Sequence, residues 1–355
     1  MIPTAEPLEE LLERQLHADP RALTVARDLL EAAFWGERGV QRRRPVIAGD
    51  GTPILLSFQE SGRAEPPPFR LLVEPGLTSL SVSEQIDYSL ATMNRLLADL
   101  AWSSSATVIN DIVRALFPSR ADAVDSWWGG LGLGMSVDSH GLELRLYCNV
   151  REGDVARRWS RIGAVFAHFG ALDLGGEALR LFIERTSLYA VPAGLALSIR
   201  DGRAHGLRLY LSVSQPDVDS IAALGNLNDA QTQAVAAICA AYPDVRPFTY
   251  GCVTVAFDFA FARNCATLTI TPVRFKADFD CTVEPGSPCS KPDLMRRWLV
   301  QRHEALGLPA DRMLAFFDTL QRTCGRYETD YVSFGWRDSA PEITTYVLPS
   351  GYATL

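Results

Sequence analysis

The stretch that decides the fold is Glu143-Leu-Arg145-Leu-Tyr147-Cys-Asn149-Val150. Its odd positions are polar and its even positions apolar, which is the period-two alternation of a β-strand with one buried and one polar face. Gly206-Leu-Arg208-Leu-Tyr210-Leu-Ser212-Val213 repeats the pattern, with Arg-x-Tyr at the same place. We therefore expect two equivalent strands that each present an arginine and a tyrosine on their polar face.

Outward from these two strands, the same alternation predicts five strand pairs along the chain. The predicted pairs are 53–59 with 69–74, 131–138 with 142–150, 194–200 with 206–213, 250–261 with 266–272, and 327–336 with 341–347. Helical periodicity separates them, at 8–33, 83–100, 106–116, 152–169, 177–185, 217–224, 229–241, 292–306 and 309–322. The unit of helix, hairpin and helix recurs roughly every 55–75 residues, which indicates an internal structural repeat.

The helices need apolar partners, and only the apolar faces of the strands supply them. The simplest closure is a ring of ten antiparallel strands with helices outside and polar faces inside. The sequence therefore predicts an α+β fold, a ten-stranded antiparallel β-barrel built from five αββα-type repeats, as one domain over residues 1–355. The pattern leaves one alternative open, an open sheet with helices on one side and water on the other.

Composition excludes several classes of protein. The net charge is −8, which argues against nucleic-acid binding. There is no run of 18 apolar residues and the N-terminal residues carry no apolar signal segment, so we expect no membrane span and a cytoplasmic protein. Seven cysteines without a Cys-x-x-Cys pair fit reduced thiols better than a disulfide scaffold.

Metal and nucleotide motifs are missing from the sequence. The five histidines lie far apart, and no Asp-Asp-x-x-Asp cluster occurs, so we expect neither a metal site nor a bound cofactor. The glycine-rich run at 129–134 lacks the spacing of a dinucleotide-binding loop. Two of the 34 basic residues are lysines, Lys276 and Lys291, and the others are arginines. Any anion site will therefore be built mainly from guanidinium groups, which match phosphate oxygens bidentately.

A closed barrel would bring a cluster of arginines and tyrosines into its lumen. The inward positions are Arg70, Arg145, Arg208, Tyr147, Tyr210, Tyr250, Tyr331 and Tyr346. Crowded positive charges are costly unless an anion neutralises them, and tyrosine rings can stabilise a carbocation by about 1–2 kcal/mol each when desolvated. An anion clamp beside an aromatic shield is what ionisation of an allylic diphosphate requires. On an open sheet the same residues would simply form a solvated face.

Eight short stretches, in order, also match the pattern of a known family. They are Trp35-Gly-Glu-Arg, Gly51-Thr-Pro-Ile-Leu-Leu-Ser57, Phe69-Arg-Leu-Leu-Val-Glu-Pro75, Arg145-Leu-Tyr147, Arg208-Leu-Tyr210, Thr271-Pro-Val-Arg274, Asp330-Tyr-Val-Ser-Phe334 and Pro341-Glu-Ile-Thr-Thr-Tyr346. Over residues 35–350 the chain resembles the aromatic prenyltransferases of the ABBA, or PT-barrel, type, and most of all their dimethylallyltryptophan synthase branch. The resemblance implies transfer of a dimethylallyl or related prenyl group from its diphosphate to an indole or another electron-rich ring in secondary metabolism, without a metal.

By this resemblance, Arg70, Arg145 and Arg208 would hold the diphosphate. Tyr147, Tyr210 and Tyr346 would shield the allylic cation, together with the further inward tyrosines Tyr331 and Tyr250. The expected partners are therefore a prenyl diphosphate and a small aromatic acceptor, bound by a monomer or a homodimer.

The sequence departs from the family pattern on the acceptor side. Leu55 occupies the acceptor-binding position where the family has a glutamate base, and threonines near Thr269 stand where a lysine is expected in the fourth hairpin. Glu143 and Asp258 are the candidate proton acceptors, although both could instead be counter-ions of the lumen arginines, and water or the released diphosphate could take the proton. Glu74 fits a structural hydrogen bond better.

Two further hypotheses remain open at this stage. A relative of these enzymes could prenylate a phenol or a peptide side chain. The missing carboxylate at Leu55 also allows a ligand-binding barrel without catalysis.

Overall fold

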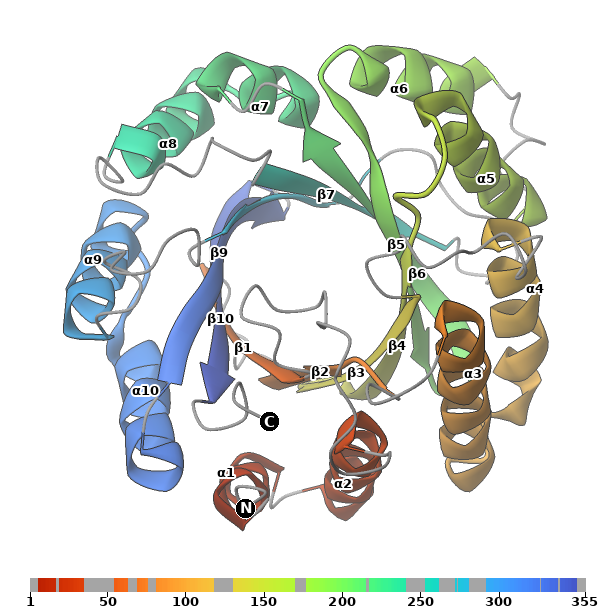
Figure 1. Cartoon of the computed structure of the whole chain (residues 1–355). Coiled ribbons are helices and arrows are strands. Elements are labelled where there is room, and N and C mark those ends of the chain that lie inside the picture. Colours follow the sequence, from red (N-terminus) through yellow and green to blue (C-terminus); the bar gives the residue numbers. More distant parts are fainter. Residues whose placement is uncertain are drawn as a thin grey trace.

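The computed structural model describes residues 6–16, 19–34, 54–62, 69–75, 81–117, 130–169, 177–214, 217–240, 253–261, 272, 274–280, 292–325, 327–337 and 339–349. Within these ranges, only the backbone is described for residues 6, 7, 34, 238–240, 279, 280 and 292. Figure 1 shows the chain as a ring of strands inside a ring of helices.

Ten strands form the inner ring, and every neighbouring pair is antiparallel. They are β1 (Ile54–Ser61), β2 (Phe69–Val73), β3 (Leu131–Asp138), β4 (Gly141–Asn149), β5 (Ala190–Arg200), β6 (Arg203–Val213), β7 (Val253–Ala260), β8 (Arg274–Asp280), β9 (Tyr327–Arg337) and β10 (Ala340–Pro349). β1 pairs with both β2 and β10, so the sheet closes on itself. The closed barrel is therefore confirmed, and the open-sheet alternative is wrong.

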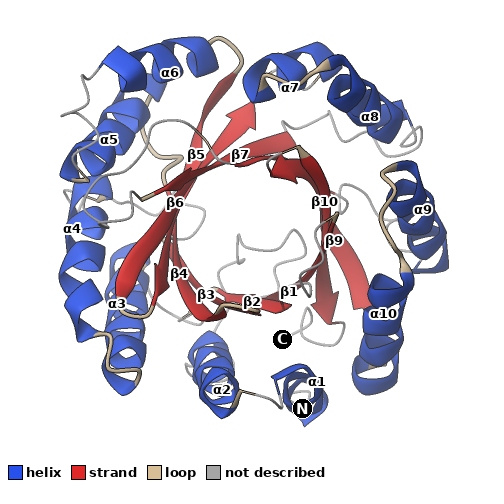
Figure 2. Ribbon diagram, turned by 180° about the vertical axis from the view of Figure 1, so that it is seen from behind, coloured by secondary structure: helices blue, strands red, loops and turns tan. Residues whose placement is uncertain are grey.

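Helices lie around the outside of the barrel (Figure 2). They are α1 (Glu6–Leu16), α2 (Pro20–Phe34), α3 (Val82–Asp99), α4 (Ala106–Leu116), α5 (Val155–His168), α6 (Glu177–Ser187), α7 (Val218–Gly225), α8 (Asp229–Ala240), α9 (Pro292–Ala305) and α10 (Asp311–Cys324). A short 3₁₀ turn (Ser103–Ser105) precedes α4. The predicted helix at 8–33 is two helices, because Asp19 accepts a hydrogen bond from the backbone N–H of Ala22 and Pro20 starts α2. A side-chain cap followed by proline is a typical helix start.

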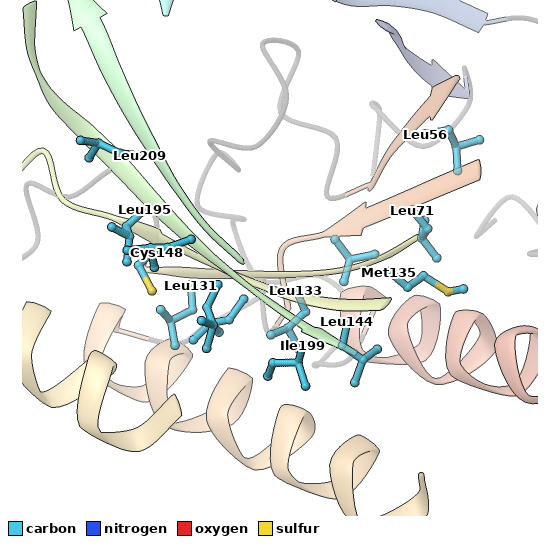
Figure 3. Packing of buried hydrophobic residues seen from close by; sticks show 14 of the residues in the cluster. Leu56, Leu71, Leu131, Leu133, Met135, Leu144, Cys148, Leu195, Ile199 and Leu209 are labelled. Atoms are coloured by element: carbon cyan, nitrogen blue, oxygen red, sulfur yellow. The ribbon is translucent and has the colours of Figure 1, made fainter. Parts of the chain in front are cut away.

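The hydrophobic core lies between the barrel and the helices. Alternate strand residues such as Leu56, Leu144 and Leu209 point outward and are fully buried against the helices' apolar faces (Figure 3). Burial of apolar surface is the main favourable contribution to folding. Because this outer face holds the core, the inner residues of each strand are free to be polar, and they set the chemistry of the lumen.

The eighth strand lies further along the chain than the sequence predicted. We expected it at 266–272, but β8 spans Arg274–Asp280, and 262–271 lie outside the described residues. The alternation of Arg274-Phe-Lys276-Ala-Asp278 is as regular as that of the threonine-rich segment. Alternation alone therefore does not distinguish the two segments. The difference comes from the pairing of β8 with β7 and β9, which the sequence pattern does not contain.

Candidate active site

Two cavities of different character lie in the described part of the lumen. The larger, of about 970 Å³, lies at the end where the two strands of each hairpin meet, since residues of those turns such as His140 and Asp201 line it. We call it the charged chamber; its lining includes Arg70, Glu143, Arg145, Arg208, Asp258 and Glu342. The smaller, of about 220 Å³, lies toward the helix-connected end, and we call it the apolar pocket; its lining includes Leu72, Leu131, Gly132, Ala193, Gly194 and Leu195.

Tyrosines lie between the two cavities. Tyr147 and Tyr210 line the apolar pocket, and each stands two residues beyond an arginine of the charged chamber on the same face of its strand. Their ring centroids are 6.4 Å apart. Tyr331 and Tyr346 face each other across β9 and β10, with ring centroids 6.3 Å apart and ring planes at 87°. These four side chains are the tyrosine layer; the predicted fifth member, Tyr250, lies outside the described residues.

Register places Arg208 directly beside Asp258, and Asp258 beside Arg274. Arg208 holds Asp258 with both Nε and Nη2, the latter 2.8 Å from Oδ2. Arg274 adds a third contact, from Nη1 to the same Oδ2 at 3.4 Å. Burial would raise the pKa of Asp258, but the guanidinium groups of Arg208 and Arg274 outweigh it and hold the pKa far below its usual value.

Glu143, on β4, forms a second ion cluster in the chamber. Arg145 donates to it through Nε, and Arg200 donates from Nη2 over 3.2 Å. Arg200 also bonds Asp138 at 2.8 Å. Burial would raise the pKa of Glu143, yet Arg145 and Arg200 lower it to about 2. Glu143 is therefore ionised at neutral pH and already bound by two cations.

Arg70 has a different environment from the other two predicted clamp arginines. Its Nη2 donates to Gln59 Oε1 at 2.6 Å, and Gln59 Oε1 also accepts from Arg274 at 2.8 Å. Within the described part of the chain, Arg70 Nε and Nη1 are buried without a hydrogen-bond partner. Burial and the neighbouring guanidinium groups of Arg145 and Arg274 lower the pKa of Arg70 to about 10.

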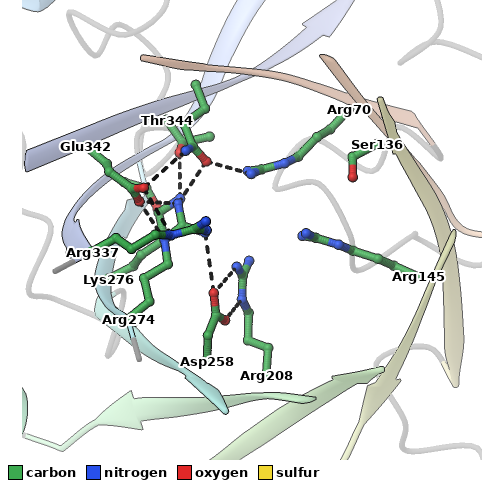
Figure 4. Close-up of polar contacts among 12 residues, drawn as sticks. Arg70, Ser136, Arg145, Arg208, Asp258, Arg274, Lys276, Arg337, Glu342 and Thr344 are labelled. Carbon is green, nitrogen blue, oxygen red and sulfur yellow. Dashed lines mark hydrogen bonds and ion pairs between the residues drawn. The ribbon is translucent and has the colours of Figure 1, made fainter. Parts of the chain in front are cut away.

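All three predicted clamp arginines face one chamber, as Figure 4 shows. Two of them are already paired with carboxylates: Arg145 with Glu143, and Arg208 with Asp258. Arg70 has two N–H groups, at Nε and Nη1, that have no hydrogen-bond partner among the described residues. A buried donor without a partner is costly, so an anion in the chamber would gain most by binding Arg70.

Lys276 is a lumen residue that the sequence reasoning missed. It is 1% exposed on β8, donates to Thr344 Oγ1 at 2.5 Å and lies 6.0 Å from the centroid of the Tyr346 ring. Burial and the nearby Arg274 and Arg70 lower the pKa of this amine well below its usual value. The expectation that threonines near Thr269 replace a fourth-hairpin lysine was therefore wrong, because it rested on the misplaced eighth strand. The signal available in the sequence was the rarity of lysine in this chain.

A glycine makes room for this lysine. Gly335 on β9 lies beside Lys276 in the register, and a Cβ there would stand 2.8 Å from Lys276 Cγ and 2.4 Å from the Phe275 carbonyl oxygen. Gly134 on β3 lies beside Arg145 in the register, and a Cβ there would stand 3.0 Å from the Tyr147 ring and 3.1 Å from the Leu71 carbonyl oxygen. Small residues opposite long ones allow the charged side chains to fit within the lumen.

Leu55 lies in a separate small cluster on the inner face of the barrel. It packs with Leu72, Leu348 and Tyr346 and is 4% exposed. Leu72 also lines the apolar pocket, as does Glu74 further along the same strand face. The wall around Leu55 is therefore hydrophobic and offers no carboxylate at that position. The apolar pocket beside it carries Glu74, Asn149 and Arg151 among its lining residues.

Among the residues that the structure describes, no three His, Cys, Asp or Glu side chains stand together as metal ligands. No helix within the described ranges is both long and apolar enough to cross a membrane.

Comparison with known proteins gives matches to solved structures. No protein-family model matches the chain, and neither does any curated protein. The crystal structure of 5-dimethylallyltryptophan synthase from Streptomyces coelicolor superposes with a TM-score of 0.75 at 16% identity, covering 98% of each chain. The 6-dimethylallyltryptophan synthase from Micromonospora olivasterospora, in complex with DMASPP and Trp, gives 0.72 at 18% identity, again covering 98% of each.

A more distant match is AnaPT from Neosartorya fischeri, with a TM-score of 0.59 at 14% identity, covering 99% of this chain and 95% of that one. These likenesses confirm that the fold is the PT-barrel.

Proposed function

We propose that this protein is an aromatic prenyltransferase that moves a dimethylallyl or related prenyl group from its diphosphate to an indole-type ring. In this reaction the allylic C–O bond breaks and diphosphate leaves with the electron pair. The π electrons of the aromatic ring form the new C–C bond, and the ring then loses a proton to become aromatic again. Such a site must bind the leaving anion, shield the cation and keep water away.

The observation that carries the proposal is the order of groups along the lumen. Cations gather in the charged chamber, four tyrosines follow, and the apolar pocket lies beyond them. A diphosphate in the chamber would place its prenyl chain among the tyrosine rings. The aromatic acceptor would then lie in the apolar pocket. Enzymes of the same fold whose names state dimethylallyltryptophan synthesis, one of them complexed with DMASPP and Trp, support this assignment.

Arg70 would be the principal diphosphate ligand, with Arg145 and Arg208 as further ligands. Tyr147, Tyr210, Tyr331 and Tyr346 would stabilise the allylic cation. Glu143 and Asp258 are bound to arginines and have depressed pKa values, so the counter-ion role suits them better than that of a general base. The proton would then leave to water or to the released diphosphate.

Leu55 and its neighbours favour a second candidate acceptor. An indole N–H directed at the cluster of Leu55, Leu72 and Leu348 would lose its hydrogen bond to water without a replacement. A phenol, whose ring can lie against an apolar wall with its hydroxyl elsewhere, avoids this cost.

The test is incubation of the purified protein with dimethylallyl diphosphate, with and without a panel of indoles, cyclic dipeptides and phenols, followed by mass spectrometry. We expect slow hydrolysis of the donor alone and a mass gain of one dimethylallyl group on at least one acceptor. We also expect activity to persist in excess chelator. A protein that binds the donor but neither hydrolyses nor transfers it would be a ligand-binding barrel.

A further inference from the structure

The charged chamber contains its own anion at the place where a diphosphate would bind. Asp258 fills the Nε–Nη2 edge of Arg208 with both of its carboxylate oxygens. A guanidinium can bind two phosphate oxygens side by side with the same edge. A diphosphate therefore cannot take this edge of Arg208 until Asp258 releases it.

The two partners of Asp258 are not equally free to move. Arg274 donates to Glu342, to Gln59 and to Asp258, and its side chain is 1% exposed. Arg208 donates to Asp258 through two atoms, and the Asp258 side chain is 21% exposed to the chamber that it lines. Arg274 is thus fixed in the wall, whereas the Arg208–Asp258 pair lies at the chamber surface, where an incoming anion can reach it.

We propose that Asp258 is an exchangeable counter-ion of the diphosphate site, a positioning residue that holds Arg208 in the empty barrel, gives it up to the donor and takes it back when diphosphate leaves. This inference rests on the proposed function, since it assumes that the chamber binds a diphosphate. An exchangeable role explains why the carboxylate of Asp258 lies in a chamber that would bind an anion. A rigid, purely cationic chamber would retain the product, whereas a built-in competitor lowers the affinity for diphosphate and speeds its release.

The contrast with Arg70 supports this division of roles. Arg70 shares Gln59 Oε1, a neutral acceptor, and leaves Nε and Nη1 for a ligand. It would bind diphosphate without competition from a carboxylate. Arg208 would bind it through the Nε–Nη2 edge only by exchange. The chamber would thus combine one permanent anchor with one exchangeable ligand.

The decisive measurement is calorimetric titration of the full chain with inorganic diphosphate. Asp258→Asn keeps the shape of the side chain and removes its charge, so it should tighten the Kd for diphosphate roughly tenfold. In turnover with the donor, the same variant should show a burst of product before a slower steady state, because release becomes limiting. Asp318→Asn is the matched control, since it removes an Asp–Arg pair with Arg296 on the exposed helix surface, and it should leave the Kd unchanged.

Two further measurements separate the possible outcomes. In Asp258→Asn combined with Arg208→Met, the tightening should disappear, because there is no freed guanidinium. In the wild-type protein, the ¹⁵Nε signal of Arg208 should move when diphosphate is added, which does not depend on any variant folding.

A weaker or unchanged Kd in Asp258→Asn would overturn the proposal and show that Asp258 only orients Arg208. An Arg208 signal that stays in place at saturating diphosphate would also overturn it. Failure of wild type and variant alike to bind diphosphate would instead refute the proposed function itself.

Discussion

The two ends of the lumen solve opposite physical problems. In the charged chamber, several ionised side chains are buried together, and each is held by a specific partner, as Glu143 is by Arg145 and Arg200. In the apolar pocket and the neighbouring Leu55 cluster, the wall is mainly hydrocarbon. One end is built to receive charge and the other to receive a ring. The tyrosine layer, which is both aromatic and polar, lies where the two meet.

The difference between the two ends shows how one barrel could bind two chemically unlike substrates at separate places in its lumen. The anion would enter the charged chamber and the aromatic ring would enter a mainly apolar pocket, so solvation favours one orientation of the two substrates. Changes at one end should then leave binding at the other end intact.

The largest effect on turnover should come from a charge placed in the Leu55 cluster. Leu55→Glu buries a carboxylate among Leu72, Leu348 and Tyr346, without a cation from those neighbours. We expect turnover with the acceptor found by screening to be abolished or redirected toward free tryptophan, while the Kd for the donor stays within about threefold of wild type. Donor titration and product mass spectrometry measure the two quantities separately. Leu55→Met, which conserves volume, is the control and should keep both. A large loss of donor affinity in Leu55→Glu would show that the two ends are coupled.

The next largest effect, on kcat/KM for the donor, should come from removing a cation from the charged chamber. Arg70→Met removes the guanidinium whose Nε and Nη1 have no partner among the described residues. Loss of one charge-assisted partner should cost about 1.5–3 kcal/mol, or roughly 10- to 150-fold in kcat/KM for the donor. The KM for the acceptor should change little. Arg114→Met, on the exposed face of α4, is the matched control. Wild-type kinetics in Arg70→Met would remove Arg70 from the diphosphate site.

How much of this comparison could be predicted from the sequence depends on the kind of contact. Alternation along 131–138 and 142–150 located β3 and β4 and placed Arg145 and Tyr147 on one face, because period-two patterning follows directly from strand geometry. The partners across the barrel could not be predicted in this way. Gln59, Arg274 and Glu342 meet from three strands, which requires the register of closure and the position of β8.

Removing one ring from the tyrosine layer should lower kcat by an intermediate amount. Tyr210→Leu removes a ring that lies between the two ends and beside Tyr147. Loss of one desolvated cation–π contact should cost about 1–2 kcal/mol, or roughly 5- to 30-fold in kcat. Burial raises the pKa of the Tyr210 hydroxyl, so the ring acts as a neutral phenol. Tyr210→Phe keeps the ring and should retain most of the activity. Equal losses in the two variants would show that the hydroxyl, rather than the ring, carries the effect.

The smallest effect on turnover should come from Glu143, because its partners already neutralise it. A positioned general base typically contributes 10²–10⁴-fold, whereas we expect Glu143→Gln to lower kcat by less than about tenfold. Its contribution should appear in stability instead. The pKa of Glu143 is about 2 in the folded protein, below its usual value of 4.5, so the stabilisation is complete above pH 4.5 and is lost as the pH falls toward 2. Urea unfolding should therefore show wild type more stable than Glu143→Gln at pH 6, with the difference shrinking at pH 3. A loss of several hundredfold in kcat, with donor binding unchanged, would identify Glu143 as the base and assign the proton to the charged end.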